Sequence, residues 1–218
     1  MHPAVELLTG VMRPPLQGGD HIDWQAWYAE FGFDLPADFK EFMDVYGGGM
    51  IDQSLSVMAL AAGDGWWRDE NQSGDYEFLH DPLSGEELEQ PLHWGIGGLI
   101  QWGGFGPEQC FWYANDPNPD SWPVVIWLPR RRVEWAHHRE GFASFLNGLI
   151  TGNIESPFSM KFPLLPEPDF MNWRDRERLR AIRVSPVSYG RDPRAVIARI
   201  EAAGLDPLDF FPSASRFL

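Results

Sequence analysis

The chain of 218 residues contains one cysteine, Cys110, so it cannot form an internal disulfide. Structural disulfides belong to oxidising compartments, and a chain without them is typical of a reducing one. No apolar run reaches about 18 residues, the length that a membrane-spanning helix needs. The first residues show no basic stretch followed by a long apolar run, so no secretory signal peptide is predicted. We therefore expect a cytoplasmic protein with no membrane partner.

Recognisable metal-binding and catalytic motifs are also missing. His137 and His138 lie near Glu134, but the spacing is not that of an HExxH zinc motif, and neighbouring strand residues point to opposite faces. Acidic residues gather in two loops without the order of an EF-hand. The glycine-rich stretches 95–98 and 103–106 lack the lysine of a phosphate-binding loop. We expect no metal, no cofactor and no catalytic residue.

Positive charge is scarce in the first part of the chain. Residues 1–122 hold 21 acidic and 3 basic residues, residues 123–218 hold 11 acidic and 14 basic ones, and the net charge is −15. An acidic surface repels nucleic acid and attracts a basic partner, although acidity can also serve solubility alone. Arginines at 130–132 and 172–183 are better explained by solvated faces or internal ion pairs than by nucleic-acid contacts. No nucleic-acid partner is expected.

One stretch, residues 35–49, organises the expected core. Pro36 suits the first turn of a helix, and Gly47 to Gly49 end that helix. The charged residues between them mostly fall off the apolar stripe. The stripe recurs at i, i+3, i+4 and i+7 and consists of Phe39, Phe42, Met43 and Tyr46. We predict that it is buried against a strand over 124–127.

Other helices follow from the same periodicity and from capping residues. Asp23 is expected to cap a helix over 24–31, whose aromatic stripe should face the core: Trp24, Trp27, Tyr28 and Phe31. Further helices are expected after Gly141, over 172–183 and after Asp192.

Short β-branched and aromatic runs, separated by turn residues, predict the strands. Their short connections favour antiparallel pairing, because a parallel crossover needs a dozen or more residues. A short helix is expected around 76–79. The predicted fold class is α+β, with helices packed on a central, mostly antiparallel sheet of five or six strands. The strand runs are 51–60, 92–94, 99–102, 110–113, 124–127 and 133–135.

The chain is expected to divide into three parts. Residues 1–152 should form the α+β domain, and the proline-rich residues 153–171 should run extended along it as a linker. Residues 172–218 should form a helical extension packed on the domain through Val196, Ile197 and Ile200.

Six blocks of sequence follow one another in a characteristic order across residues 20–152. The second of them reads LP-x-D-F-K-x-F and ends in YGGG. The blocks are 23–33, 35–49, 98–103, 110–113, 122–127 and 141–146. This order resembles the SUKH superfamily, the Smi/Knr-like proteins. The resemblance implies an α+β domain that binds proteins and has no known catalytic site.

The resemblance implies an immunity protein, which sequesters and neutralises a toxin domain, often a nuclease. The acidic charge fits a basic toxin as the protein partner. A regulatory or scaffold module of the Smi/Knr type is the alternative, and an enzyme of unknown class is the third possibility.

Recognition is expected in the loop over residues 63–85, which is polar, acidic and rich in turn residues. Loops of this kind can vary while the core stays intact. The candidate partner contacts, chosen for their position in this loop and their composition, are Asp64, Trp66, Trp67, Asp69, Glu70, Asp75 and Tyr76.

Overall fold

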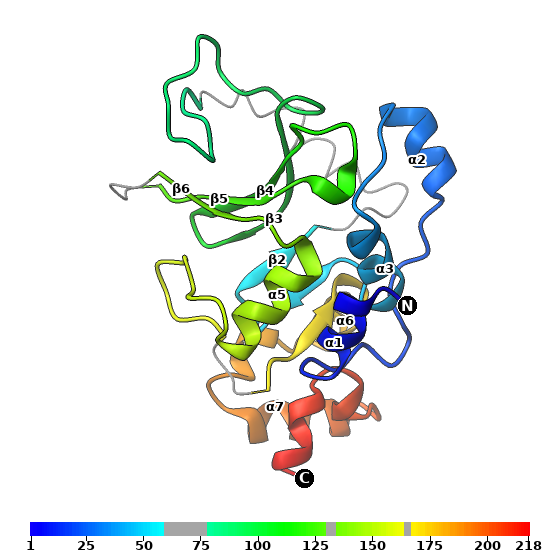
Figure 1. Cartoon of the computed structure of the whole chain (residues 1–218). Helices are drawn as coiled ribbons and strands as arrows, with labels where there is room; N and C mark the ends of the chain where they lie inside the picture. The colour runs from blue at the N-terminus through cyan, green and yellow to red at the C-terminus, as the bar shows by residue number, and fades with distance from the viewer. Residues whose placement is uncertain (59–77, 130–133, 164–166) are drawn as a thin grey trace.

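The computed structural model describes residues 1–58, 78–129, 134–163 and 167–218. In these ranges, seven strands form one sheet in the order β6-β5-β4-β3-β2-β1-β7, and all neighbours are antiparallel (Figure 1). This confirms the predicted α+β class, with a sheet slightly larger than expected. The strands are β1 (Gly49–Ile51), β2 (Leu55–Val57), β3 (Leu99–Phe105), β4 (Glu108–Tyr113), β5 (Val124–Trp127), β6 (Trp135–His138) and β7 (Phe170–Asn172).

The predicted helices after Asp23, Gly141 and Asp192 are present. The side chain of Asp23 accepts hydrogen bonds from two N–H groups of its helix, and Asp192 accepts one from Ala195. The α-helices are α1 (Pro3–Thr9), α2 (Trp24–Phe31), α3 (Ala37–Val45), α5 (Phe142–Thr151), α6 (Trp173–Ala181) and α7 (Pro193–Ala202). Short 3-10 helices are η1 (Pro119–Ser121), η2 (Pro186–Ser188), η3 (Pro207–Asp209) and η4 (Pro212–Arg216). No helix among the described residues is long and apolar enough to cross a membrane.

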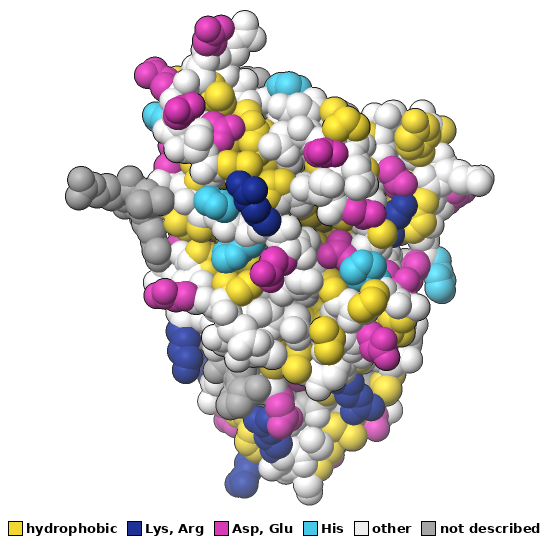
Figure 2. All heavy atoms as spheres, in the orientation of Figure 1, with side chains coloured by type: hydrophobic (Ala, Val, Ile, Leu, Met, Phe, Trp, Pro, Cys, Tyr) yellow, Lys and Arg dark blue, Asp and Glu magenta, His cyan; other side chains and the backbone are white. Residues whose placement is uncertain are grey.

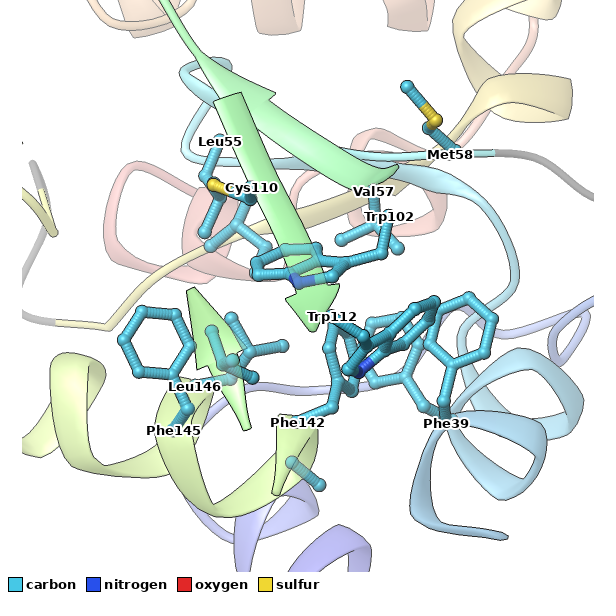
Figure 3. Close-up of a cluster of buried hydrophobic side chains, with 14 of the residues drawn as sticks. Phe39, Leu55, Val57, Met58, Trp102, Cys110, Trp112, Phe142, Phe145 and Leu146 are labelled. Atoms are coloured by element: carbon cyan, nitrogen blue, oxygen red, sulfur yellow. The ribbon is translucent and has the colours of Figure 1, made fainter. Parts of the chain in front are cut away.

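The main core lies between the sheet and the helices α1, α3 and α5 (Figure 1). Successive strand residues point to opposite faces, so alternate residues of β4 and β5 enter this core. Figure 3 shows Trp102 and Trp112 meeting Phe142 of α5, with ring centroids 4.9 Å and 6.1 Å from Phe142. We call this helix-covered side the inner face of the sheet. Its inward residues on β4 and β5 are Cys110, Trp112, Val124 and Ile126.

The apolar stripe of α3 is buried, as the sequence predicts: Phe42, Met43 and Tyr46 are fully covered and Phe39 is 1% exposed. The stripe shares one core cluster with Val124 and Ile126 of the predicted partner β5. Its rings also meet Trp112 of β4, Phe142 of α5 and Phe170 of β7. Helix α5 reaches from β6, where its Phe145 ring lies against His138, to β3, where its Phe142 and Phe145 rings meet Trp102.

Two helix N-termini are capped by carboxylates from distant segments. Asp120 of η1 accepts a 2.7 Å hydrogen bond from the N–H of Ala37 at the start of α3. Asp38 of α3 accepts one of 2.8 Å from the N–H of Ala143 at the start of α5. Although it was expected on the polar side of α3, Asp38 is buried, and this burial raises its pKa against the opposing effect of the Ala143 hydrogen bond.

The stretch expected to hold a strand, residues 51–60, contains β2, which the left-handed residues Asp52 and Gln53 join to β1 in a hairpin. Three local expectations differ from the structure. Residues 92–94 contribute only an isolated bridge to β3. Residues 78 and 79 are not helical. Tyr28 is 58% exposed, because α2 has only one face against the core and Trp27 occupies it.

The end of the proline-rich segment belongs to the sheet. Residues 170–172 form β7, which pairs with β1 along Gly49 to Ile51. Earlier in the segment, Phe158 and Phe162 pack on Phe105 of β3, at centroid distances of 4.4 Å and 5.8 Å. The segment is therefore tied to the inner core by aromatic side chains and by a strand that its proline content does not predict.

The C-terminal extension packs on the opposite, outer face at β7. Val196, Ile197 and Ile200 are buried, as predicted, in a cluster with Met171 of β7. A buried polar contact supports this docking, since the carboxylate of Asp169 accepts hydrogen bonds from the N–H and the hydroxyl of Ser213.

Candidate protein-binding surface

The seven residues predicted to contact a partner lie outside the described residues, within 59–77. They are Asp64, Trp66, Trp67, Asp69, Glu70, Asp75 and Tyr76. The described chain resumes at Phe78, and the surface that follows from there is the candidate site.

Residues 78–92, which we call the outer cover, lie on the outer face of β3 to β6. The segment folds back on itself, since the N–H of Leu92 donates to the carbonyl of Phe78 at 3.0 Å. Its Phe78 ring lies 5.2 Å from that of Trp127 and 5.0 Å from that of Trp135. A small apolar cluster, separate from the inner core, therefore holds the outer cover in place.

A cleft of about 460 Å³ opens between the outer cover and the edge strand β6. Residues 80–85 form one side, and Glu134, Trp135 and His137 form the other. Because β6 is the last strand at its end of the sheet in the described chain, the cleft lies beside an edge that a partner can reach.

Asp81 fixes the shape of the outer-cover side of the cleft. One of its oxygens accepts hydrogen bonds from the N–H groups of Leu83 and Ser84, and the other accepts one of 2.8 Å from the hydroxyl of Tyr113. Partial burial acts to raise the pKa of Asp81, but these hydrogen bonds outweigh it and lower the pKa below 3.8. Burial, with the nearby charge of Asp81, raises the pKa of Tyr113 to about 12. Asp81 is therefore a carboxylate at neutral pH.

Glu134 holds the other side of the cleft. One of its oxygens lies 3.0 Å from Nδ1 of His80, and the other accepts a 3.3 Å hydrogen bond from the indole N–H of Trp127. The side chains of Glu134 and His80 are 39% and 48% exposed, so both reach solvent. These contacts orient the carboxylate while leaving it accessible to a partner.

The outer-cover side of the cleft is acidic, whereas on the other side Arg130, Arg131 and Arg132 closely precede Glu134 in the sequence. From residue 78 to residue 129 there are seven acidic residues and no lysine or arginine. In Figure 2, Asp and Glu side chains gather at the upper end of the molecule, where the outer cover lies in Figure 1, and most Lys and Arg side chains lie toward the lower end. The charge asymmetry of the sequence is thus also an asymmetry in space.

The two neighbouring histidines of β6 face opposite ways, as the sequence predicts. His137 lines the cleft, whereas His138 turns inward against Phe145, and burial lowers the pKa of His138. Within the described residues, no group of three or more His, Cys, Asp or Glu side chains could hold a metal ion.

The most deeply buried reactive side chains pack in the core or hold separate segments of the chain together. Cys110 is fully buried among apolar residues, and burial together with the charge of Glu108 raises the pKa of its thiol. A thiol in this state is a poor nucleophile. The buried carboxylates Asp38 and Asp169 accept backbone hydrogen bonds that join separate segments. Each of these groups therefore has a structural role.

The sequence alone did not indicate the residues that form the cleft. His80 and Asp81 carried no motif, and Glu134 and His137 stood out only as metal candidates. The pairing of His80 with Glu134 joins positions 54 residues apart. The long stretch without basic residues, 78–129, indicates an acidic region, but it does not predict which residues lie next to one another in the cleft.

Comparison with family models, with curated proteins and with solved structures found no match.

Proposed function

We propose that this chain is a noncatalytic protein-binding domain, an immunity protein that sequesters and neutralises a basic toxin domain. The observation that carries the proposal is the acidic outer cover beside the open sheet edge, which contains Asp81, Glu86, Glu87 and Glu89 and no lysine or arginine. The resemblance to the SUKH superfamily provides the functional class.

The distribution of reactive groups supports binding rather than catalysis. Catalytic sites combine a nucleophile or acid–base pair with a concave, accessible pocket. In the described chain, the buried candidates Cys110, Asp38 and Asp169 are tied into the fold. The accessible cleft holds one imidazole–carboxylate pair, His80 with Glu134, but among the described residues no hydroxyl or thiol is hydrogen-bonded to this pair to serve as a nucleophile. Such a surface acts by complementarity of charge and shape.

The proposed mechanism separates capture from retention. Long-range attraction by the acidic surface speeds encounter with a basic partner. Buried aromatic anchors then slow dissociation, because a few desolvated contacts carry most of the binding energy. In addition to residues near the cleft, the predicted contacts in 64–76 remain part of the proposed interface.

The first experiment identifies the partner and tests neutralisation. The tagged full chain is used to capture proteins from a lysate of its own organism, and each captured protein is expressed alone in a bacterial host. We expect one of them to arrest growth and the chain to restore growth when it is expressed alongside. A captured protein that is harmless alone would contradict the immunity function and leave a regulatory module.

The second experiment tests the acidic surface with a matched pair of variants. Glu86→Lys with Glu89→Lys reverses two exposed charges on the outer cover, and Glu155→Lys with Glu201→Lys reverses two exposed charges elsewhere. Stopped-flow association with the toxin should slow and lose salt dependence only in the first variant, since exposed charges are screened beyond roughly 8–10 Å. Equal slowing in both variants would mean that net charge, and not this surface, drives encounter.

A further inference from the structure

We infer that the cleft between the outer cover and β6 is a binding pocket for an arginine side chain of the protein partner. This inference rests on the proposed function and names the chemical group that the acidic surface receives. It concerns residues 80–85 with Glu134, Trp135 and His137.

The charge of the pocket selects a cation. Asp81 and Glu134 contribute a carboxylate from each side, and none of the described residues that line the pocket is a lysine or arginine. Both carboxylates are already oriented, Asp81 by three hydrogen bonds and Glu134 by His80 and Trp127. Charged groups held in place before binding cost less to order when the ligand arrives.

An aromatic residue of the lining, Trp135, favours arginine over lysine. The indole N–H of Trp127, which is not among the lining residues, donates a hydrogen bond to Glu134. A planar guanidinium stacks on aromatic faces and sheds its water more easily than a lysine ammonium does. It can also donate to a carboxylate through two parallel N–H groups, which gives geometric selectivity.

The same side of the pocket holds an unpaired donor. Trp135 is 7% exposed, and its indole N–H has no acceptor among the described residues. Buried donors usually have a partner. This N–H is itself closed to solvent, so a carbonyl of a bound peptide can accept from it only after the side chains around Trp135 move.

The experiment uses the full chain and short capped peptides of the form Gly-X-Gly, with arginine, lysine or citrulline at X. Binding is followed by NMR through the indole N–H signals of Trp127 and Trp135 and the ring signals of His80 and His137. At constant ionic strength, the arginine peptide should shift these signals in a saturable way. Citrulline has almost the same shape as arginine without the charge, and its affinity should be lower by a factor of about ten or more.

Two variants distinguish arginine binding in the pocket from general electrostatic attraction by the acidic surface. Glu134→Gln should weaken arginine binding about tenfold, whereas Glu89→Gln, which removes the same charge outside the pocket, should leave binding within about twofold. Circular dichroism and the remaining NMR signals check that both variants are folded. Equal losses in the two variants, equal binding of citrulline, or lysine binding as tightly as arginine would each overturn the inference.

The outcome is independent of the toxin experiment. If neutralisation and its salt dependence hold while the peptide fails to bind, the arginine pocket is wrong and the proposed function stands. If the peptide binds as described and no captured protein is toxic, the pocket stands and the immunity function fails.

Discussion

The inner face of the sheet is covered by three helices, whereas the outer face of β3 to β6 is covered by an irregular stretch, residues 78–92. The inner cover is largely apolar, with rings from α3 and α5 packed against those of β3 and β4. The outer cover combines a small aromatic cluster with the Asp81 hydrogen bonds and the Glu134–His80 pair. The comparison leads us to predict that the inner face provides most of the stability, and it is the outer face that we propose for recognition.

The largest effect is expected on the inner face. Phe42→Ala should lower the free energy of unfolding by about 3–5 kcal/mol, because it removes a fully buried ring and leaves a cavity. Chemical denaturation monitored by circular dichroism measures the loss. A loss below about 1 kcal/mol would show that α3 is peripheral and that the inner face is not the source of stability.

The same truncation on the outer cover should cost less. Phe78→Ala removes a ring that contacts Trp127 and Trp135, but the cover can detach without unfolding the inner core. We expect a loss of about 2 kcal/mol. Faster amide exchange should be confined to residues 78–92 and their neighbours on β5 and β6. Equal global losses for Phe42→Ala and Phe78→Ala would mean that the two faces unfold as one unit.

The capping of α5 by Asp38 belongs to the inner face and should have an intermediate effect. Asp38→Ala removes the acceptor for the N–H of Ala143, and the loss of a helix cap costs about 1–2 kcal/mol. Asp44→Ala on the same helix is the control, because Asp44 is exposed and should change stability by less than about 0.5 kcal/mol. Similar losses in the two variants would show that the hydrogen bond of Asp38 to α5 does not contribute to stability.

A smaller effect is expected from the hydroxyl of Tyr113. Tyr113→Phe deletes the hydrogen bond to Asp81 and should cost about 1 kcal/mol. It should also raise the pKa of Asp81, which NMR titration of the carboxyl carbon can follow. Because the pKa of Asp81 is lower in the folded state than in the unfolded state, its carboxylate stabilises the fold at pH values above the unfolded-state pKa. This stabilisation is lost as the pH falls, so Tyr113→Phe should also make stability less dependent on pH in the acid range. An unchanged Asp81 titration would show that Tyr113 does not anchor the outer cover.

The smallest effect is a pH dependence at Asp38. Its folded-state pKa is raised by burial, so its contribution to stability is present below pH 3.8 and is lost as the pH rises through the folded-state pKa. Relative to Asp38→Asn, which cannot ionise, the wild type should therefore gain stability between about pH 7 and pH 4. Denaturation at a series of pH values measures this difference, and a difference that moves the other way would mean that the Asp38 carboxylate is stabilised in the fold.

The sequence alone determined the local elements of this protein. Apolar spacing located the buried stripe of α3, and capping residues located the starts of α2 and α7, because these signals act between residues a few positions apart. Alternating and β-branched runs identified β3, β4 and β5 for the same reason. The α+β class follows from their order along the chain.

The tertiary structure decided which distant groups meet. Asp38 looked like a polar surface residue, and only the approach of α5 made it a buried cap. Strand β7 is read from sequence as the end of a proline-rich linker, because its pairing partner β1 lies about 120 residues away. The cleft has the same origin, since His80 and Glu134 become neighbours only when the outer cover folds over β6. Local periodicity carries no information about such contacts, which depend on how the completed elements pack.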